Sequence, residues 1–70
     1  MNVLILGAGG REHAFSWKIS QSPILGNLYI APGNPGTAQC GTNLAISVTD
    51  FEGIAAAIRT HDIGLVVVGP

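Results

Sequence analysis

The chain has 70 residues, of which 47% are apolar and 10% are charged, and its formal net charge is −1. A chain of this length forms one domain at most, and its apolar fraction excludes a disordered segment. The three basic residues, Arg11, Lys18 and Arg59, form no cluster, so the charge distribution argues against a nucleic-acid-binding protein.

The first half of the chain predicts a strand, a helix and a second strand. Residues 2–6 form a run with almost no polar alternation, which is typical of a parallel strand covered on both faces. A glycine-rich turn ends this strand, and residues 11–21 carry a broad apolar stripe at helical spacing. Residues 28–31 predict the second strand. We interpret Trp17 and Tyr29 as packing residues of these elements.

The second half predicts a loop, a strand, a helix and a final strand. Residues 32–42 are rich in Gly, Pro, Asn and Thr and predict a loop, whereas residues 44–48 alternate loosely and predict a third strand. Thr49 and Glu52 have the spacing of a capping box with Thr49 as the N-cap. The apolar residues behind them recur at helical spacing, which predicts an amphipathic helix. Residues 65–68 predict a fourth buried strand.

The order strand, helix, strand, strand, helix, strand predicts an α/β fold. We expect an open, mostly parallel sheet with flanking helices, of the Rossmann-like type. The chain starts with Met1 and stops just after an apolar strand that nothing later in the sequence covers. We therefore expect the amino-terminal part of a longer protein, with the fold truncated at residue 70.

Nothing in the sequence indicates a secreted or membrane-bound protein. Cys40 is the single cysteine, so it has no intramolecular disulfide partner, which fits a reducing compartment. The apolar runs are far shorter than the ~20 residues of a membrane span. The run that follows Met1 is also too short for a signal peptide. We expect a cytoplasmic protein.

The glycine-rich turn and the helix start behind it form the strongest candidate site. Ligands bind beyond the carboxyl ends of strands in open α/β sheets, and free amides at a helix start favour an anion. Arg11 adds a planar cation suited to phosphate or carboxylate, Glu12 can accept from an amine or hydroxyl, and His13 can donate to a ligand. Each of the three also has a plain structural role in a first helical turn. Their adjacency is what favours a site.

Two known phosphate-binding motifs fit the turn poorly. Gly7 and Gly9 match the first two positions of the dinucleotide motif G-x-G-x-x-G, but Glu12 occupies the third. The acidic residue that should follow about 20 residues later is missing, because none lies between Glu12 and Asp50. A P-loop is excluded because no Gly-Lys-Ser/Thr follows. The alternatives left open are a dinucleotide-binding domain of an oxidoreductase and a non-enzymatic module that binds a nucleotide or sugar phosphate.

Four short motifs occur in order along the chain: Gly9-Gly-Arg-Glu-His-Ala14, Trp17-Lys-Ile19, Ala31-Pro-Gly-Asn-Pro-Gly-Thr37 and Val67-Val-Gly-Pro70. Together they resemble the opening signatures of the phosphoribosylamine–glycine ligase family, which belongs to the ATP-grasp superfamily. The resemblance covers all 70 residues. Cys40 stands where members often carry a different residue.

The resemblance implies that residues 1–70 are an incomplete amino-terminal, substrate-binding domain of an enzyme with several domains. Such ligases use ATP and Mg²⁺ (or Mn²⁺) to join glycine to 5-phosphoribosylamine in purine biosynthesis, releasing ADP and phosphate. ATP and the metal are expected to bind in later domains, so this chain alone should be inactive. The implied partners are these small-molecule substrates and the remaining domains of the same enzyme, with no nucleic acid and no membrane.

The resemblance also implies which residues line the phosphoribosylamine pocket. By position in the motifs these are Gly9, Gly10, Arg11, Glu12, His13, Pro32, Gly33, Asn34, Gly69 and Pro70. It implies no catalytic residue and no metal ligand within the chain. The reacting groups would then belong to segments outside it.

Overall fold

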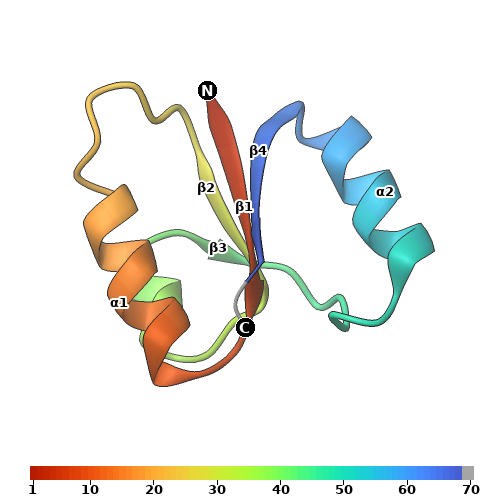
Figure 1. Cartoon of the computed structure of the whole chain (residues 1–70), viewed down its shortest axis with the longest axis horizontal. Helices are drawn as coiled ribbons and strands as arrows, with labels where there is room; N and C mark the ends of the chain where they lie inside the picture. The colour runs from red at the N-terminus through yellow and green to blue at the C-terminus, as the bar shows by residue number, and fades with distance from the viewer. Residues whose placement is uncertain (69–70) are drawn as a thin grey trace.

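A computed structural model describes residues 1–68, which form a four-stranded parallel sheet with one helix on each face (Figure 1). The predicted α/β fold class and the predicted order of elements are therefore confirmed. In chain order the elements are β1 (Asn2–Gly7), α1 (Gly10–Ile19), β2 (Leu28–Pro32), the 3₁₀ helix η1 (Thr37–Gln39), β3 (Thr42–Asn43), α2 (Phe51–Thr60) and β4 (Ile63–Val68).

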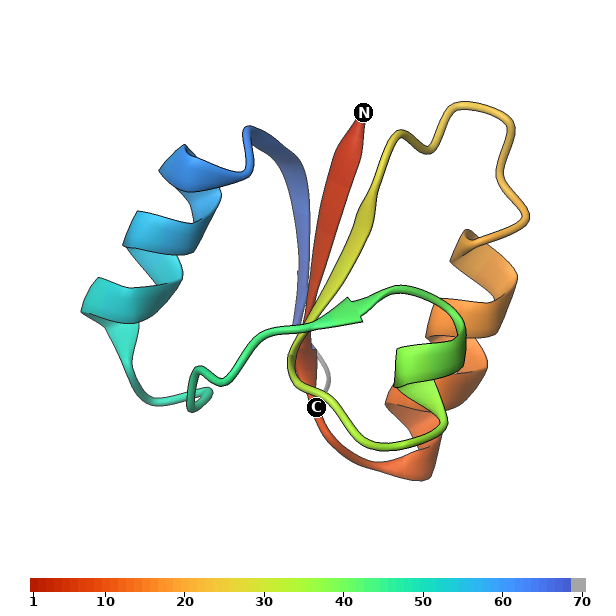
Figure 2. The ribbon, with the colours of Figure 1, turned by 180° about the vertical axis from the view of Figure 1, so that it is seen from behind.

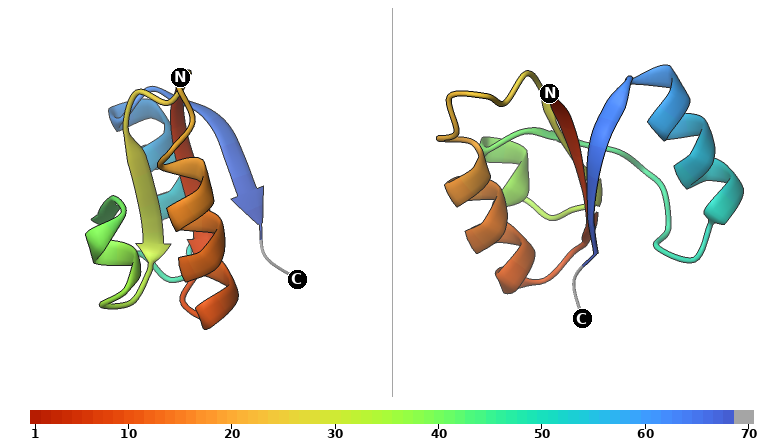
Figure 3. Two further views of the ribbon diagram at one scale, coloured as in Figure 1. Left: turned by 90° about the vertical axis from the view of Figure 1, so that its left-hand side faces the viewer. Right: turned by 45° about the horizontal axis from the view of Figure 1, so that its top comes forward.

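The sheet has the strand order β3-β2-β1-β4, so the first strand in the sequence lies inside the sheet. Val3 pairs with Leu28 of β2 on one side and with Leu65 of β4 on the other. This explains why β1 is apolar along its length, since a strand with a neighbour on each side and a helix on each face meets no solvent. In Figure 3 the strands run toward the same end of the sheet, and both helices begin there.

The core has two layers, because successive side chains of a strand point to opposite faces. On the face that α1 covers, Val3 and Ile5 pack with Leu28 and Ile30 of β2. On the face that α2 covers, the buried cluster comprises Leu4, Ala31 and Ile54. Burying a side chain of this size contributes roughly 1.5–3 kcal/mol. The two clusters therefore hold the helices to the sheet from opposite sides.

Helix α1 packs on the sheet through a different face from the one that its apolar residues predict. Ser16 is its buried residue, and the Ser16 hydroxyl donates to the carbonyl of Glu12 at 2.7 Å. Phe15 and Trp17 are 44% and 58% exposed, so the interpretation of Trp17 as a packing residue was wrong. The cause is the inward position of Glu12, whose carboxylate lies over Gly7. Ser16 and Ile19 follow Glu12 by four and seven residues and share its face of the helix, whereas Trp17 lies about 140° around the helix axis from Glu12.

The predicted third strand at residues 44–48 is wrong. Strand β3 comprises Thr42 and Asn43 and pairs with β2. The amide of Leu44 still donates to the Ile30 carbonyl at 2.7 Å, but the amide of Ile46 then donates to the Leu44 carbonyl at 2.8 Å. A hydrogen bond between residues two apart closes a tight turn, and this turn takes the chain away from the sheet.

Helix α2 begins one residue later than the predicted capping box. Asp50, not Thr49, is the N-cap, and its carboxylate accepts a hydrogen bond from the Gly53 amide at 3.0 Å. The predicted amphipathic pattern is confirmed for Ile54, which is buried, but Phe51 is 77% exposed. Phe51 is the first residue of the helix, where the chain has not yet reached the sheet.

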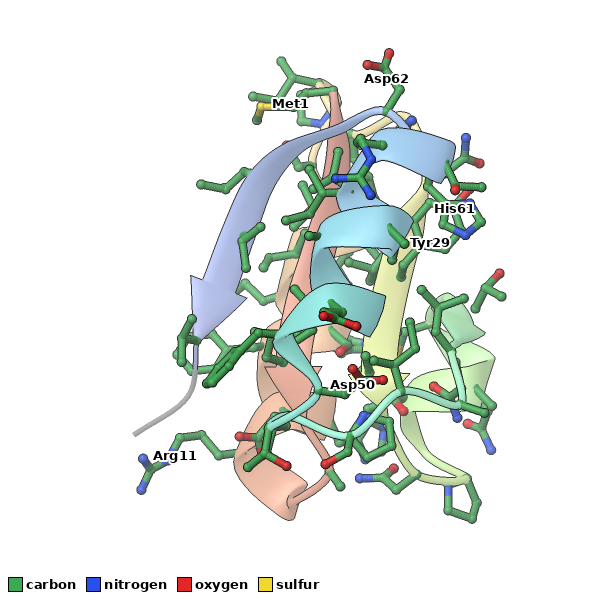
Figure 4. All side chains as sticks on the ribbon, turned by 90° about the vertical axis from the view of Figure 1, so that its right-hand side faces the viewer. Met1, Arg11, Tyr29, Asp50, His61 and Asp62 are labelled. Atoms are coloured by element: carbon green, nitrogen blue, oxygen red, sulfur yellow. The ribbon has the colours of Figure 1, made fainter. Side chains whose placement is uncertain are left out.

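The end of the sheet opposite the helix starts is held together by Asn2. Its side-chain oxygen accepts from the amide of Asn27 at 2.9 Å, and its amide nitrogen donates to the His61 carbonyl at 2.7 Å. His61 is half-buried with its ring against Tyr29, at 4.3 Å between ring centroids, and Asp62 is exposed beside it (Figure 4). No helix within residues 1–68 is long and apolar enough to cross a membrane.

Candidate functional site

The predicted site residues meet at one edge of the sheet, where β1 and β2 end and α1 begins. Gly9, Gly10, Arg11, Glu12 and His13 follow β1, and the loop that starts at residue 32 follows β2. Figure 2 shows this loop and η1 beside the start of α1. The predicted residues Gly69 and Pro70 lie outside the described part of the chain.

The loop after β2 is bonded directly to the glycine turn after β1. The Gly33 amide donates to the Gly7 carbonyl at 3.0 Å. The side-chain nitrogen of Asn34 donates to the carbonyls of Ala8 at 2.8 Å and Gly9 at 3.1 Å. Pro32 precedes these contacts, is exposed, and follows a cis peptide bond with Ala31. The sequence prediction that these two segments form one site is consistent with this contact.

Two residues that the sequence did not point to, Thr37 and Asn43, hold Asn34 in place by hydrogen bonds. The Thr37 amide donates to the Asn34 side-chain oxygen at 2.9 Å, and the Asn34 amide donates to the Thr37 hydroxyl at 2.8 Å. Asn43 of β3 bonds to both of them. The signal in the sequence is the Asn-x-x-Thr spacing, because side chains three residues apart can cap each other's amides as a capping box does.

Glu12 occupies one of the backbone amides that the start of α1 could otherwise offer to an anion. Its carboxylate accepts from the Gly9 amide at 2.9 Å, so this amide is not free for a ligand. A Cβ on Gly7 would collide with the Glu12 side chain, which shows how closely the carboxylate covers the turn. The first amides of a helix have no intrahelical acceptor, which leaves those of Gly10, Arg11 and Glu12 as donors for a ligand, because the first backbone bond of α1 comes from His13.

Arg11 and His13 differ in how firmly they are held. The Arg11 side chain is exposed and extends away from the sheet (Figure 4). The His13 ring is half-buried beside Gly36, where an added Cβ would lie 2.7 Å from the His13 Cε1 atom. His13 thus has a fixed place against the loop, whereas Arg11 is free to reach a ligand.

A shallow hollow of about 370 Å³ lies on the flank of α1 and is lined by Gly10, His13, Ala14 and Trp17. Two of the predicted site residues, Gly10 and His13, thus border the same open space. Among residues 1–68 no three His, Cys, Asp or Glu side chains lie close enough together to hold a metal ion. The described site therefore offers hydrogen-bond donors, one exposed cation and an imidazole, which suit an anionic sugar phosphate.

Comparison with known protein families identifies the family of the chain. The family model described as "Phosphoribosylglycinamide synthetase, N domain" matches residues 1–70. The chain belongs to this family. The resemblance seen in the four sequence motifs is thereby confirmed, and family membership does not favour the dinucleotide-binding oxidoreductase.

Members of this N-domain family with high identity to the chain occur in bacteria and animals. The phosphoribosylamine–glycine ligase of Yersinia pestis is 54% identical over 72 residues, which cover 100% of this chain and 17% of the relative. The trifunctional purine biosynthetic protein adenosine-3 of Gallus gallus is 50% identical over 97% of this chain and 7% of its own length. The crystal structure of the Thermotoga maritima phosphoribosylamine–glycine ligase has a TM-score of 0.77 and 33% identity, and covers 100% of this chain and 16% of that one.

The chain spans about a sixth of the length of the ligases that it matches. Its fold agrees with the corresponding part of the Thermotoga structure, which supports the Rossmann-like assignment. The relatives are named as ligases or as a purine biosynthetic protein, and they act on small molecules by those names.

Proposed function

We propose that this chain is the amino-terminal, substrate-binding domain of a phosphoribosylamine–glycine ligase that joins glycine to 5-phosphoribosylamine in purine biosynthesis. The observation that carries the proposal is the match of the N-domain family over the whole chain, with relatives of that name at up to 54% identity. The complete enzyme would be cytoplasmic and belong to the ATP-grasp superfamily. ATP with Mg²⁺ (or Mn²⁺), bound by segments outside this chain, would supply the energy of ligation.

The role of this domain is to hold the phosphoribosylamine while its amine is presented to the activated glycine. The free amides of Gly10 and Arg11 lie at the positive end of the α1 dipole, where an anionic phosphate is favoured. The guanidinium of Arg11 can fold back onto the same phosphate with two parallel hydrogen bonds. His13 borders the adjoining hollow and can donate to a ribose hydroxyl.

The remaining predicted residues shape the pocket in this proposal. Gly9 and Gly33 let the backbone approach the ligand closely, and Glu12 fixes the turn through the Gly9 amide. Pro32 lines the side that β2 contributes, and Asn34 joins the loop behind it to the glycine turn. Gly69 and Pro70 complete the list on the family motif alone. None of these residues takes part in bond making, so the domain binds and orients its substrate.

Arg11→Ala in the full-length protein tests the proposal. Loss of a charge-assisted contact worth about 1.5–3 kcal/mol should lower kcat/KM for phosphoribosylamine by roughly tenfold or more, while KM for ATP stays unchanged. Arg11→Lys should restore part of the loss, since lysine keeps the charge without the planar fork. Arg59→Ala is the matched control, because Arg59 is exposed in the last turn of α2, at the far end of the sheet.

Two results would contradict the proposal at different levels. Equal phosphoribosylamine kinetics for wild type, Arg11→Ala and Arg59→Ala would remove Arg11 from the site. A folded full-length protein that forms no ADP with glycine, phosphoribosylamine and ATP would refute the ligase assignment itself.

A further inference from the structure

The side chain of Asn34 has both of its donor hydrogens committed within the fold. Its oxygen accepts from the Thr37 amide, and its two N–H groups go to the carbonyls of Ala8 and Gly9. An amide side chain has two donor hydrogens, and both are used here. Asn34 therefore works as a clamp between the loop after β2 and the glycine turn after β1, although its place in the family motif suggested direct contact with substrate.

The clamp is itself held by a buried hydroxyl. Thr37 is fully buried, and its Oγ1 atom lies 2.9 Å from the Asn34 carbonyl and 2.7 Å from the Asn43 side-chain oxygen. A hydroxyl donates one hydrogen, and the Asn43 side-chain oxygen is the nearer of its two acceptors, while the Asn34 carbonyl also receives a hydrogen from the Asn43 side-chain nitrogen at 2.8 Å. The Thr37 hydrogen thus goes to Asn43, which completes a closed set of bonds. No buried side-chain nitrogen or oxygen in residues 1–68 lacks a partner.

The geometry of the peptide bond connects this clamp to the outward-facing amides. In a trans peptide the N–H of one residue points opposite to the C=O of the residue before it. The Gly9 carbonyl accepts from the Asn34 side chain and, as the first bond of α1, from the His13 amide at 3.3 Å, so the amide of Gly10 points away from both. The Ala8 carbonyl is turned toward Asn34, so the Gly9 amide points toward the Glu12 carboxylate that it bonds.

We propose that Asn34, Thr37 and Asn43 are positioning residues that aim the Gly10 amide at the anionic group of the substrate. They act through the Ala8 and Gly9 carbonyls and touch no ligand themselves. The consequence for binding rests on the proposed function, whereas the effect on the turn is a property of the fold. A partly satisfied polar network is worse than a complete one, so loss of one member should loosen the whole turn.

Three substitutions in the full-length protein separate the parts of the network. Asn34→Asp keeps the oxygen that accepts from the Thr37 amide and removes both donors to the turn. Thr37→Val keeps the shape and removes the hydroxyl without adding charge. Thr37→Ser keeps the hydroxyl and is the matched control.

Hydrogen–deuterium exchange with mass spectrometry measures the turn directly. In the turn and the first residues of α1, the amides of Gly9 and His13 are hydrogen-bonded, to the Glu12 carboxylate and to the Gly9 carbonyl. Asn34→Asp and Thr37→Val should each speed exchange of these two bonded amides by about tenfold, the effect of losing one or two hydrogen bonds. Thr37→Ser should exchange like wild type, and residues 54–60 of α2 should be unchanged in all three variants. Exchange of the Gly9 and His13 amides that stays at the wild-type rate in both Asn34→Asp and Thr37→Val would overturn the proposal, even if residues 33–43 exchange faster.

Steady-state kinetics measure the consequence for the substrate. KM for phosphoribosylamine should rise about tenfold in Thr37→Val and return to wild type in Thr37→Ser, with kcat and KM for ATP within about twofold. A faster-exchanging turn with an unchanged KM would refute the aiming of the Gly10 amide. A wild-type protein without ligase activity would refute the proposed function, and the exchange rates would still decide whether the three residues hold the turn. If Thr37→Val does not fold, Asn34→Asp carries both measurements.

Discussion

Gly33→Ala places a single methyl group where the candidate site is most tightly built. The φ of Gly33 is +75°, and an alanine in this left-handed region costs about 1–2 kcal/mol. The new Cβ would collide with the side-chain oxygen of Asn43 and lie 2.7 Å from the Thr37 hydroxyl. Overpacking of this kind costs typically about 1–3 kcal/mol. The two effects together lower the free energy of unfolding by about 2–5 kcal/mol.

This loss is large for so short a chain. At about 0.05–0.15 kcal/mol per residue, 70 residues have a free energy of unfolding of roughly 4–10 kcal/mol. Urea unfolding followed by far-ultraviolet circular dichroism measures the change. With an m-value of about 1 kcal/mol/M, the midpoint for Gly33→Ala should fall by about 2 M or more.

Gly10→Ala is the same chemical change at a position that tolerates it. No atom lies within 4 Å of a Cβ at Gly10, and alanine at this first residue of α1 is a better helix former than glycine. Its free energy of unfolding should stay the same or rise by up to about 1 kcal/mol, and the urea midpoint should stay or rise with it. If both alanines shifted the midpoint equally, neither the backbone angle nor the crowding at Gly33 could be the cause.

Three further outcomes follow from the packing. Asp50→Ala should lower the free energy of unfolding by about 0.5–2 kcal/mol and Thr49→Ala by clearly less, as measured by urea midpoints; the reverse order would make Thr49 the cap. Ile54→Ala should cost about 2–5 kcal/mol because Ile54 is 8% exposed, whereas Phe51→Ala, at 77% exposure, should stay within about 0.5 kcal/mol in the same assay. The isolated 70-residue chain should bind a hydrophobic dye such as anilinonaphthalene sulfonate, because β4 is an edge strand with Leu65 46% exposed; a folded chain that leaves the dye dark would contradict this.

The order of elements could be predicted because each strand and helix carries its own periodicity. The apolar runs of β1 and β4 and the spacing in α2 are local signals, and the structure confirms the three elements. The prediction that the last strand is buried is wrong, because β4 lies at the edge of the sheet, with Leu65 and Val68 46% and 70% exposed. The inward face of α1 could not be predicted in this way. In the structure Glu12 reaches back to the Gly9 amide and the small Ser16 faces the sheet, while Phe15 and Trp17 stay exposed.

The sequence predicts the edge of the sheet at which the candidate site lies, but it does not predict the hydrogen bonds that hold the site together. Glycines after parallel strands, with Arg11 and His13 at a helix start, indicate which edge of the sheet to examine. The bonds from Asn34 to Ala8 and Gly9 join residues about 25 apart in the sequence, and no spacing rule predicts such a contact. The place of Asn34 in the motif therefore indicates a role at the site. Its hydrogen bonds to Ala8 and Gly9 indicate that this role is to position the glycine turn.

The position of β1 inside the sheet has a consequence for synthesis of the protein. β1 leaves the ribosome well before its partner β4, which begins at Ile63. At about 5–20 residues per second, β1 waits roughly 3–12 s for that partner, with apolar side chains on both of its faces. During this interval the nascent chain offers a binding segment to ribosome-associated chaperones. β1 gains its second neighbour only when β4 has been synthesised.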